Sequence, residues 1–93
     1  MEQIISSSSE SVVISLCKEI EYIRSRTKII KQSLKHCQNK TLTSRLDIEL
    51  SKLKEKINSI QRIAEKLFHN NSSDLSIELL LEITHRTIFI QNL

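Results

Sequence analysis

The residues of this chain that could do chemistry are its histidines, cysteines and carboxylates. Glu82 and His85 form a Glu-x-x-His unit, the spacing with which helical di-iron proteins place two ligands on one helix face. Those proteins need two such units and two further carboxylates, whereas this chain has one unit. We therefore expect no metal, unless a dimer supplies a second copy, and no other cofactor. His85 is then a histidine on the surface of a helix.

The two cysteines are the remaining candidates for catalysis. His36 directly precedes Cys37, but adjacent residues of a helix point about 100° apart. A buried thiol that packs as a small apolar group is the simpler interpretation for Cys37 and for Cys17. Within one helix the two thiols would lie about 30 Å apart, too far for a disulfide. Because free thiols are typical of a reducing compartment, we predict a cytoplasmic protein. Because no catalytic arrangement is found among these residues, we also predict that the protein is not an enzyme.

Four cations form a second pattern, here called the basic stripe. They are spaced 4, 3 and 4 residues apart, and no acid lies between Glu21 and Asp47. This spacing aligns them along about 16 Å of one helix, which could follow a phosphate backbone. The segment has no Phe, Tyr or Trp for stacking on bases. Three interpretations of these cations are ranked. The first is a face exposed to solvent or lying between subunits, the second is a surface for an acidic protein partner, and the third is a surface for a nucleic acid. The basic stripe consists of Arg24, Lys28, Lys31 and Lys35.

The composition points to an all-α domain. The chain has 93 residues, a length typical of one domain, and it contains neither Gly nor Pro. Tight hairpin turns favour glycine, so an all-β or doubly wound fold is not expected, and the phosphate-binding loops that require glycine are excluded. Aromatic residues make up only 3% of the chain, so an aliphatic core is expected. The net charge of +3 is smaller than that of most nucleic-acid binders.

Two rows of apolar residues with heptad spacing predict two long helices, at about residues 8–37 and about 43–69. The polar residues 38–41 between them predict a turn at 38–42, and hence an antiparallel hairpin with coiled-coil-like packing. The first row contains Val13, Leu16, Ile20, Ile23, Thr27 (its one polar member), Ile30, Leu34 and Cys37, and the second contains Leu46, Leu50, Leu53, Ile57, Ile60, Ala64 and Leu67.

The expected helix starts depend on capping residues. Ser7 and Glu10 have the spacing of a capping box for the first helix. Thr41 or Thr43 could cap the second helix. Asp74 is expected at the start of the third helix, where its negative charge suits the helix dipole.

The third helix, at about residues 74–92, differs from the other two because its apolar residues point in nearly every direction. Such a helix is buried on more than one side. The excess of apolar surface on this helix predicts self-association or the binding of a partner's apolar helix. The alternative is that the helix has a central position in a compact bundle. Thr87 to Ile90 also has strand propensity. The large apolar residues are Leu75, Ile77, Leu79, Leu80, Leu81, Ile83, Ile88, Phe89, Ile90 and Leu93.

The tip of the hairpin is a second candidate for an exposed apolar surface. The first two helices would span about 40–45 Å and the third about 30 Å or less. If the third helix folds back beside the first, the tip remains uncovered, and exposed apolar surface often marks an interaction site. Residues 1–23 carry a net charge of −3 and residues 24–45 a net charge of +7. An antiparallel dimer would place these opposite charges together.

These observations predict one domain over residues 1–93, a three-helix antiparallel bundle that forms a homodimer. No signal peptide or membrane span is expected. The expected function is a non-enzymatic protein–protein interaction module, such as a small adaptor, regulator or chaperone, that binds a partner helix. The alternative is a nucleic-acid-associated dimeric regulator that uses the basic stripe. No small-molecule substrate is expected. The predicted partner-binding residues are Leu34, Leu42, Leu46, Ile77, Leu80, Leu81, Ile88 and Phe89.

Overall fold

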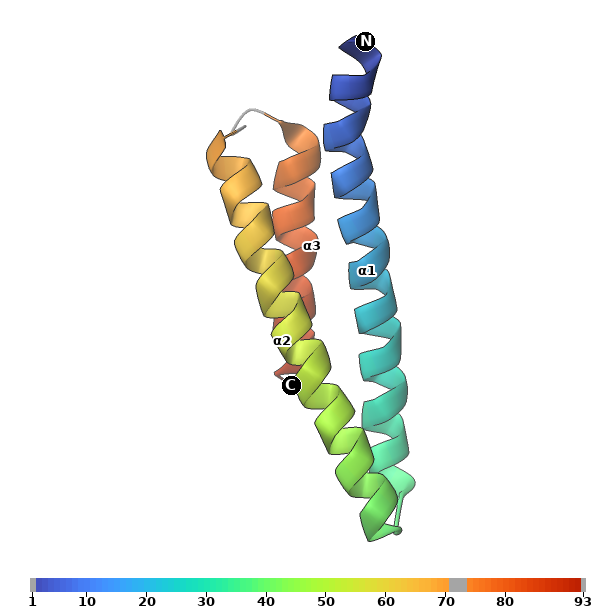
Figure 1. Cartoon of the computed structure of the whole chain (residues 1–93). Helices are drawn as coiled ribbons and strands as arrows, with labels where there is room; N and C mark the ends of the chain where they lie inside the picture. The colour runs from blue at the N-terminus through green and yellow to red at the C-terminus, as the bar shows by residue number, and fades with distance from the viewer. Residues whose placement is uncertain (1, 71–73, 93) are drawn as a thin grey trace.

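The computed structural model describes the backbone of residues 2–70 and 74–92, and the side chains of residues 11–70 and 74–92. Three helices account for nearly all of this part of the chain, and it contains no strand. They are α1 (Glu2–His36), α2 (Lys40–Asn70) and α3 (Leu75–Gln91). Figure 1 shows that α1 and α2 form a hairpin and that α3 folds back beside both of them, antiparallel to α2. The predicted all-α class is confirmed.

The first helix begins at Glu2, several residues before the predicted start at about residue 8. The backbone is helical through Ser7 and Glu10, so the helix does not start at the predicted capping box, whose side chains lie outside those described. Serine is only a few tenths of a kcal/mol less favourable than the best helix formers. Because no Gly or Pro interrupts the serine run, the helix continues through it.

The joint between α1 and α2 is shorter than the predicted turn at 38–42, because α2 already begins at Lys40. The cap is Asn39 and not Thr41 or Thr43. The Asn39 side-chain oxygen accepts a hydrogen bond from the Leu42 backbone N–H at 3.1 Å, and the Asn39 backbone carbonyl accepts one from the Thr43 backbone N–H at 2.9 Å. Asparagine is among the preferred N-cap residues, so this correction follows ordinary capping preferences.

The third helix begins where the sequence predicted. Asp74 is its N-cap, and the carboxylate accepts a hydrogen bond from the Ser76 backbone N–H at 2.9 Å. Thr87 to Ile90 is helical despite its strand propensity, because it packs along the hairpin rather than against another strand. Between the predicted second and third helices, α2 continues to Asn70, and residues 71–73 lie outside the described residues.

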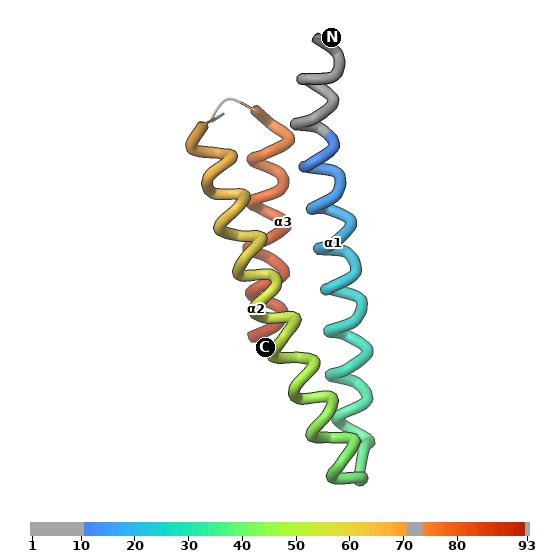
Figure 2. The backbone as a smooth tube through the Cα atoms, in the orientation of Figure 1, coloured from blue at the N-terminus to red at the C-terminus, as the bar shows by residue number. Residues whose placement is uncertain are grey.

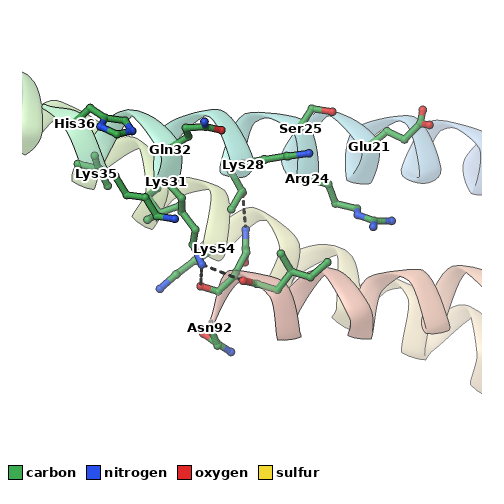
Figure 3. Close-up of a pocket in the computed structure, with 15 residues that line it drawn as sticks. Glu21, Arg24, Ser25, Lys28, Lys31, Gln32, Lys35, His36, Lys54 and Asn92 are labelled. Atoms are coloured by element: carbon green, nitrogen blue, oxygen red, sulfur yellow. Dashed lines mark hydrogen bonds between the residues drawn. The ribbon is translucent and has the colours of Figure 1, made fainter.

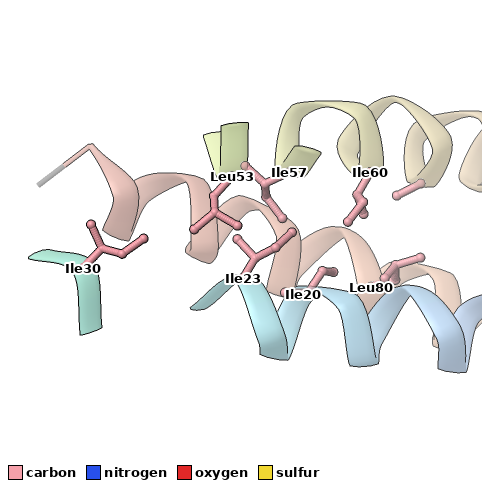
Figure 4. Close-up of a cluster of buried hydrophobic side chains, with 8 residues drawn as sticks. Ile20, Ile23, Ile30, Leu53, Ile57, Ile60 and Leu80 are labelled. Atoms are coloured by element: carbon pink, nitrogen blue, oxygen red, sulfur yellow. The ribbon is translucent and has the colours of Figure 1, made fainter. Parts of the chain in front are cut away.

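The core lies where the three helices run side by side (Figure 4). The predicted rows supply most of it, because their central members are buried while their ends are only partly covered. From α3 the apolar contribution is Ile77 and Leu80. The buried apolar residues of the two rows are Ile20, Ile23, Ile30, Leu53, Ile57, Ile60 and Ala64.

Polar side chains fill the core beside the second half of α3. The Gln91 amide nitrogen donates a hydrogen bond to the Thr27 hydroxyl at 3.3 Å, which joins α3 to α1. The hydroxyl groups of Thr84 and Thr87 donate to carbonyls of their own helix, at 2.7 and 2.8 Å. Buried polar groups need such partners, because an unpaired one loses its hydration without compensation. This polar layer was not predicted.

The C-terminal end of α3 lies part-way along the hairpin (Figure 2). Beyond that end only α1 and α2 pack together, so the elongated molecule, 55 × 23 × 15 Å, has a three-helix body and a two-helix tip. Residues 31–52 form this tip, and none of their side chains is fully buried.

Candidate functional site

An open groove runs along α1 from Glu21 to His36, beside the C-terminal end of α3 and beyond it. Ile90, Gln91 and Asn92 line it from the end of α3, and α2 lines its other side (Figure 3). Its volume is about 1390 Å³, whereas small-molecule pockets usually measure about 300–1,000 Å³ and are more enclosed. The groove is therefore better suited to a segment of another macromolecule than to a small ligand.

Apolar side chains of the hairpin line the groove. Leu34 comes from the α1 row and Leu50 from the α2 row, and both are partly buried. They belong to the same heptad-spaced rows that are covered by α3 in the body. Leu46 lies one helical turn from Leu50 towards the tip and is also partly buried. A helix that continued the line of α3 would cover these residues.

Cations surround this apolar floor. All four residues of the basic stripe line the groove, and α2 adds Lys54 from the opposite side. His36 also lines it, and Glu21 is the one acidic residue among the lining side chains. The structure thus gathers the basic stripe at the same place as the apolar tip residues, which the sequence could present only as two separate features.

Lys31 has an intramolecular role within the stripe. Its ammonium group donates hydrogen bonds to the carbonyl oxygens of Ile90 and Gln91, at 3.0 and 2.9 Å (Figure 3). The last carbonyls of a helix have no partner within the helix and carry a partial negative charge. Lys31 therefore holds the end of α3 against α1 at the mouth of the groove.

Two ion pairs join α1 to α2. Arg26 binds Glu49 through two hydrogen bonds, at 2.5 and 2.9 Å, and Lys56 lies 2.5 Å from Glu19. The hydrogen bond from Arg26 is the main cause that lowers the pKa of Glu49. The same bond raises the pKa of Arg26, and the bond to Glu19 raises the pKa of Lys56. Both pairs join the facing sides of α1 and α2, and none of their four residues lines the groove.

The predicted partner-binding residues fall into two groups. Leu34 lies in the groove and Leu46 beside it, and Leu42 is 47% exposed near the joint. The residues of α3 are divided by the direction in which they point. Ile77 and Leu80 are buried in the core, so the folded chain does not offer them to a partner. The remaining predicted residues are Leu81 and Ile88, which pack partly buried against the core, and Phe89, which is exposed.

Two charged residues of the groove, Lys54 and Glu21, were not among the site residues predicted from the sequence. Lys54 follows Leu50 by four residues, so it lies one turn along the same side of α2. That spacing could have indicated it, but only together with the knowledge that α3 stops before this point. The inward position of Gln91 had no comparable indication, because the surrounding residues are apolar.

The two pairs considered for chemistry, His36 with Cys37 and Glu82 with His85, belong to different parts of the chain. Glu82 pairs with Arg86 at 2.8 Å on the surface of α3. Cys37 accepts a hydrogen bond from the Thr43 hydroxyl at 3.5 Å, and burial raises the pKa of the Cys17 thiol. Within the part of the chain that the structure describes, no three His, Cys, Asp or Glu side chains are grouped as a metal site requires. None of the described helices combines the length and apolarity of a membrane span.

Comparison with protein families, with curated proteins and with solved structures gives no match to this chain. The interpretation of the groove therefore depends on its own residues.

Proposed function

We propose that this chain is a non-enzymatic protein–protein interaction module, a small adaptor, regulator or chaperone, that binds one helix of a partner protein at the tip. The observation that carries the proposal is the groove beyond α3, where the apolar rows of α1 and α2 continue without a covering helix. Helix-in-groove recognition uses such a surface, because the apolar face of an amphipathic helix replaces water over it.

The charges around the groove specify the partner further. A helix that packs on Leu34 and Leu50 would have its flanks close to the basic stripe and to Lys54. Acidic residues on those flanks would meet opposite charges. Such complementarity mainly orients the partner and increases the association rate, while the apolar contact supplies affinity. The proposed partner is therefore an acidic amphipathic helix.

The alternative is a nucleic acid bound along the basic stripe. The clustering of the four stripe residues with Lys54 in one groove favours it. The apolar floor does not, because a phosphate backbone gains nothing from leucine side chains. The lining residues also include no Phe, Tyr or Trp on which a base could stack.

Binding of a labelled synthetic helix, measured by fluorescence anisotropy, tests the proposal. The peptide carries Leu at heptad spacing and Glu on its flanks, and a matched peptide carries Lys in place of Glu. We expect the acidic peptide to bind and the basic peptide not to bind. Leu34→Ala with Leu50→Ala should weaken binding at least tenfold, and Lys28→Glu with Lys35→Glu should do the same. Leu75→Ala, on the exposed face of α3, is the matched control and should change nothing.

A nucleic-acid function predicts a different pattern with the same variants. Single-stranded and double-stranded oligonucleotides should then bind the wild-type chain, and the charge reversals should abolish that binding while Leu34→Ala with Leu50→Ala leaves it intact. This pattern, or failure of the acidic peptide to bind at any concentration, would contradict the proposed function.

We also propose that the chain forms a homodimer through α3 and that the α1–α2 hairpin packs as a coiled coil. The exposed apolar residues Leu75, Leu79 and Phe89 on α3 support the dimer, and the 3 and 4 spacing of the buried residues supports the coiled coil. Light scattering across a dilution series should give about twice 10.8 kDa at high concentration. The free thiols of Cys17 and Cys37 support a cytoplasmic location.

A further inference from the structure

The helix α3 carries two rows of residues on opposite sides. The inner row faces the hairpin and is buried, and its second half is polar. The outer row has the spacing 4, 3, 4, 3 and every member is exposed. At 100° per residue the members of the outer row lie within about 80° of one another, on the side opposite the core. The inner row is Ile77, Leu80, Thr84, Thr87 and Gln91, and the outer row is Leu75, Leu79, Glu82, Arg86 and Phe89.

The outer row is apolar at both ends and charged in the middle. Leu79 is 54% exposed and Phe89 is 67% exposed. Between them Glu82 and Arg86 form an ion pair at 2.8 Å. Two large apolar residues separated by opposite charges on one face, while threonines are buried on the other, indicate a surface that a further chain covers.

The order of residue types in this row is self-complementary when one copy is reversed. If two copies of α3 lie antiparallel with their two-fold axis at the level of Thr84, Leu79 of each copy lies opposite Phe89 of the other. In the same arrangement Glu82 of each lies opposite Arg86 of the other. Rows with 3 and 4 spacing pair in this way in antiparallel coiled coils, because a layer joins unlike heptad positions. An isologous interface requires this kind of self-complementarity.

We propose that a second copy of this chain covers the outer row of α3, antiparallel and in this register, with Leu79–Phe89 layers outside two Glu82–Arg86 layers. This register rests on the proposed self-association of α3 and specifies it.

Other arrangements of the two helices are disfavoured by charge. In a parallel dimer Glu82 would face Glu82 of the second copy, and Arg86 would face Arg86. An antiparallel shift of one heptad places Leu79 opposite Glu82, or Phe89 opposite Arg86. Like charges opposite each other, and charges buried against apolar residues, are both unfavourable. The antiparallel register at Thr84 avoids both.

A hollow on the surface supports the same register. Beside Phe89, α1 and α3 leave a shallow depression of about 420 Å³, lined by Arg24, His85, Arg86, Phe89 and Ile90. The antiparallel arrangement brings Leu79 of the second copy to this place. Because the whole contact is limited to one face of a 17-residue helix, we expect a reversible dimer that depends on concentration.

Charge exchange tests the pairing in solution. Sedimentation equilibrium of the full chain should show dimerisation, weakened at least tenfold by Glu82→Arg and by Arg86→Glu, since each places like charges in both central layers. An equimolar mixture of these two variants should dimerise again, and so should the double variant Glu82→Arg/Arg86→Glu. Circular dichroism checks folding, which these exposed positions should leave unchanged. A dimer unaffected by either single change would overturn the proposed register.

Disulfide cross-linking tests the direction of the helices. In a background with Cys17→Ala and Cys37→Ala, a Leu79→Cys chain mixed with a Phe89→Cys chain should form a covalent heterodimer on mild oxidation. Neither chain alone should cross-link efficiently. A parallel dimer would give the reverse result, cross-links in each chain alone, and would overturn the proposal. Absence of any dimer at millimolar concentration would refute self-association itself, and the peptide-binding test of the groove would be unaffected.

Discussion

The body and the tip of the hairpin carry the same sequence pattern but differ in burial. In the body the rows of α1 and α2 are covered by α3, and Ile23, Ile57 and Ile60 are almost completely buried. In the tip the rows continue with the same spacing through Leu34 and Leu50, yet these side chains are only partly buried. Two helices can cover one side of an apolar row, and a third helix is needed to complete its burial. The difference therefore marks the surface on which the proposed partner helix would pack.

The largest expected effect separates the body from the tip in stability. Ile57 lies in the body and is 0% exposed. Replacing it by Ala should lower the unfolding free energy of the protein by about 2–5 kcal/mol, and replacing it by Val should lower it by about 0.5–1.5 kcal/mol. Leu42→Ala at the exposed end of the tip should change it by no more than about 0.5 kcal/mol. Urea unfolding followed by circular dichroism measures all three. Equal losses for Ile57→Ala and Leu42→Ala would erase the distinction between the two regions.

The polar layer at the boundary of the body should behave as a coupled pair. Thr27→Val removes the oxygen that accepts from Gln91 and should cost about 1–3 kcal/mol, because the buried amide keeps no partner. The double change Thr27→Val with Gln91→Leu should recover most of this loss by making both positions apolar. Urea unfolding of the wild type, the two single variants and the double variant gives the coupling free energy between the two side chains. Simple additivity of the two single changes would mean that the hydrogen bond contributes nothing.

A smaller effect is expected where Lys31 holds the end of α3. Lys31→Met should lower the unfolding free energy by about 0.3–1 kcal/mol and should raise amide exchange of the last turn of α3. Lys35→Met, in the same stripe but beyond α3, is the control and should leave that exchange unchanged. If both substitutions have the same effect, general positive charge and not the contact with α3 is responsible.

The smallest effect concerns the Arg26–Glu49 pair and depends on pH. Because this pair lowers the pKa of Glu49 below its usual value of 4.5, the folded state binds fewer protons than the unfolded state. Its stabilising contribution is present above that value and is lost as pH falls through the folded pKa. Glu49→Gln should therefore reduce stability at pH 7, with a difference from wild type that shrinks in acid. Urea unfolding of both proteins between pH 7 and pH 3 measures this difference, and a difference that stays constant over that range would contradict the role of the pair.

Much of the fold could be predicted because it follows from local patterns. The heptad rows indicated which sides of α1 and α2 are buried, from Ile20 to Ile30 and from Leu53 to Ala64. Asp74 was identified as the start of α3 from its chemistry. The predicted starts of the first two helices were wrong. The first helix continues through the serine run that includes Ser7, and the second is capped by Asn39 rather than by Thr41 or Thr43.

The candidate site could be predicted only in part. Sequence spacing identified the basic stripe and the uncovered leucines of the tip, but it offered no reason to place them in one groove. It also assigned Ile77 and Leu80 to a partner surface, whereas the structure buries them. Both sides of α3 carry residues at heptad spacing. The spacing therefore does not indicate which side of this helix faces the core.

The sequence alone determined that this protein is helical and that α1 and α2 have one apolar side each, because helix periodicity and the absence of glycine and proline act within a few turns of the chain. The tertiary structure decided which side of α3 faces inward and how far along the hairpin it extends. Those choices depend on the Gln91–Thr27 and Lys31 contacts between residues about sixty positions apart. Contacts of that range leave no periodic trace in the sequence, so the end of α3 along the hairpin and its exposed face are seen only in the tertiary structure.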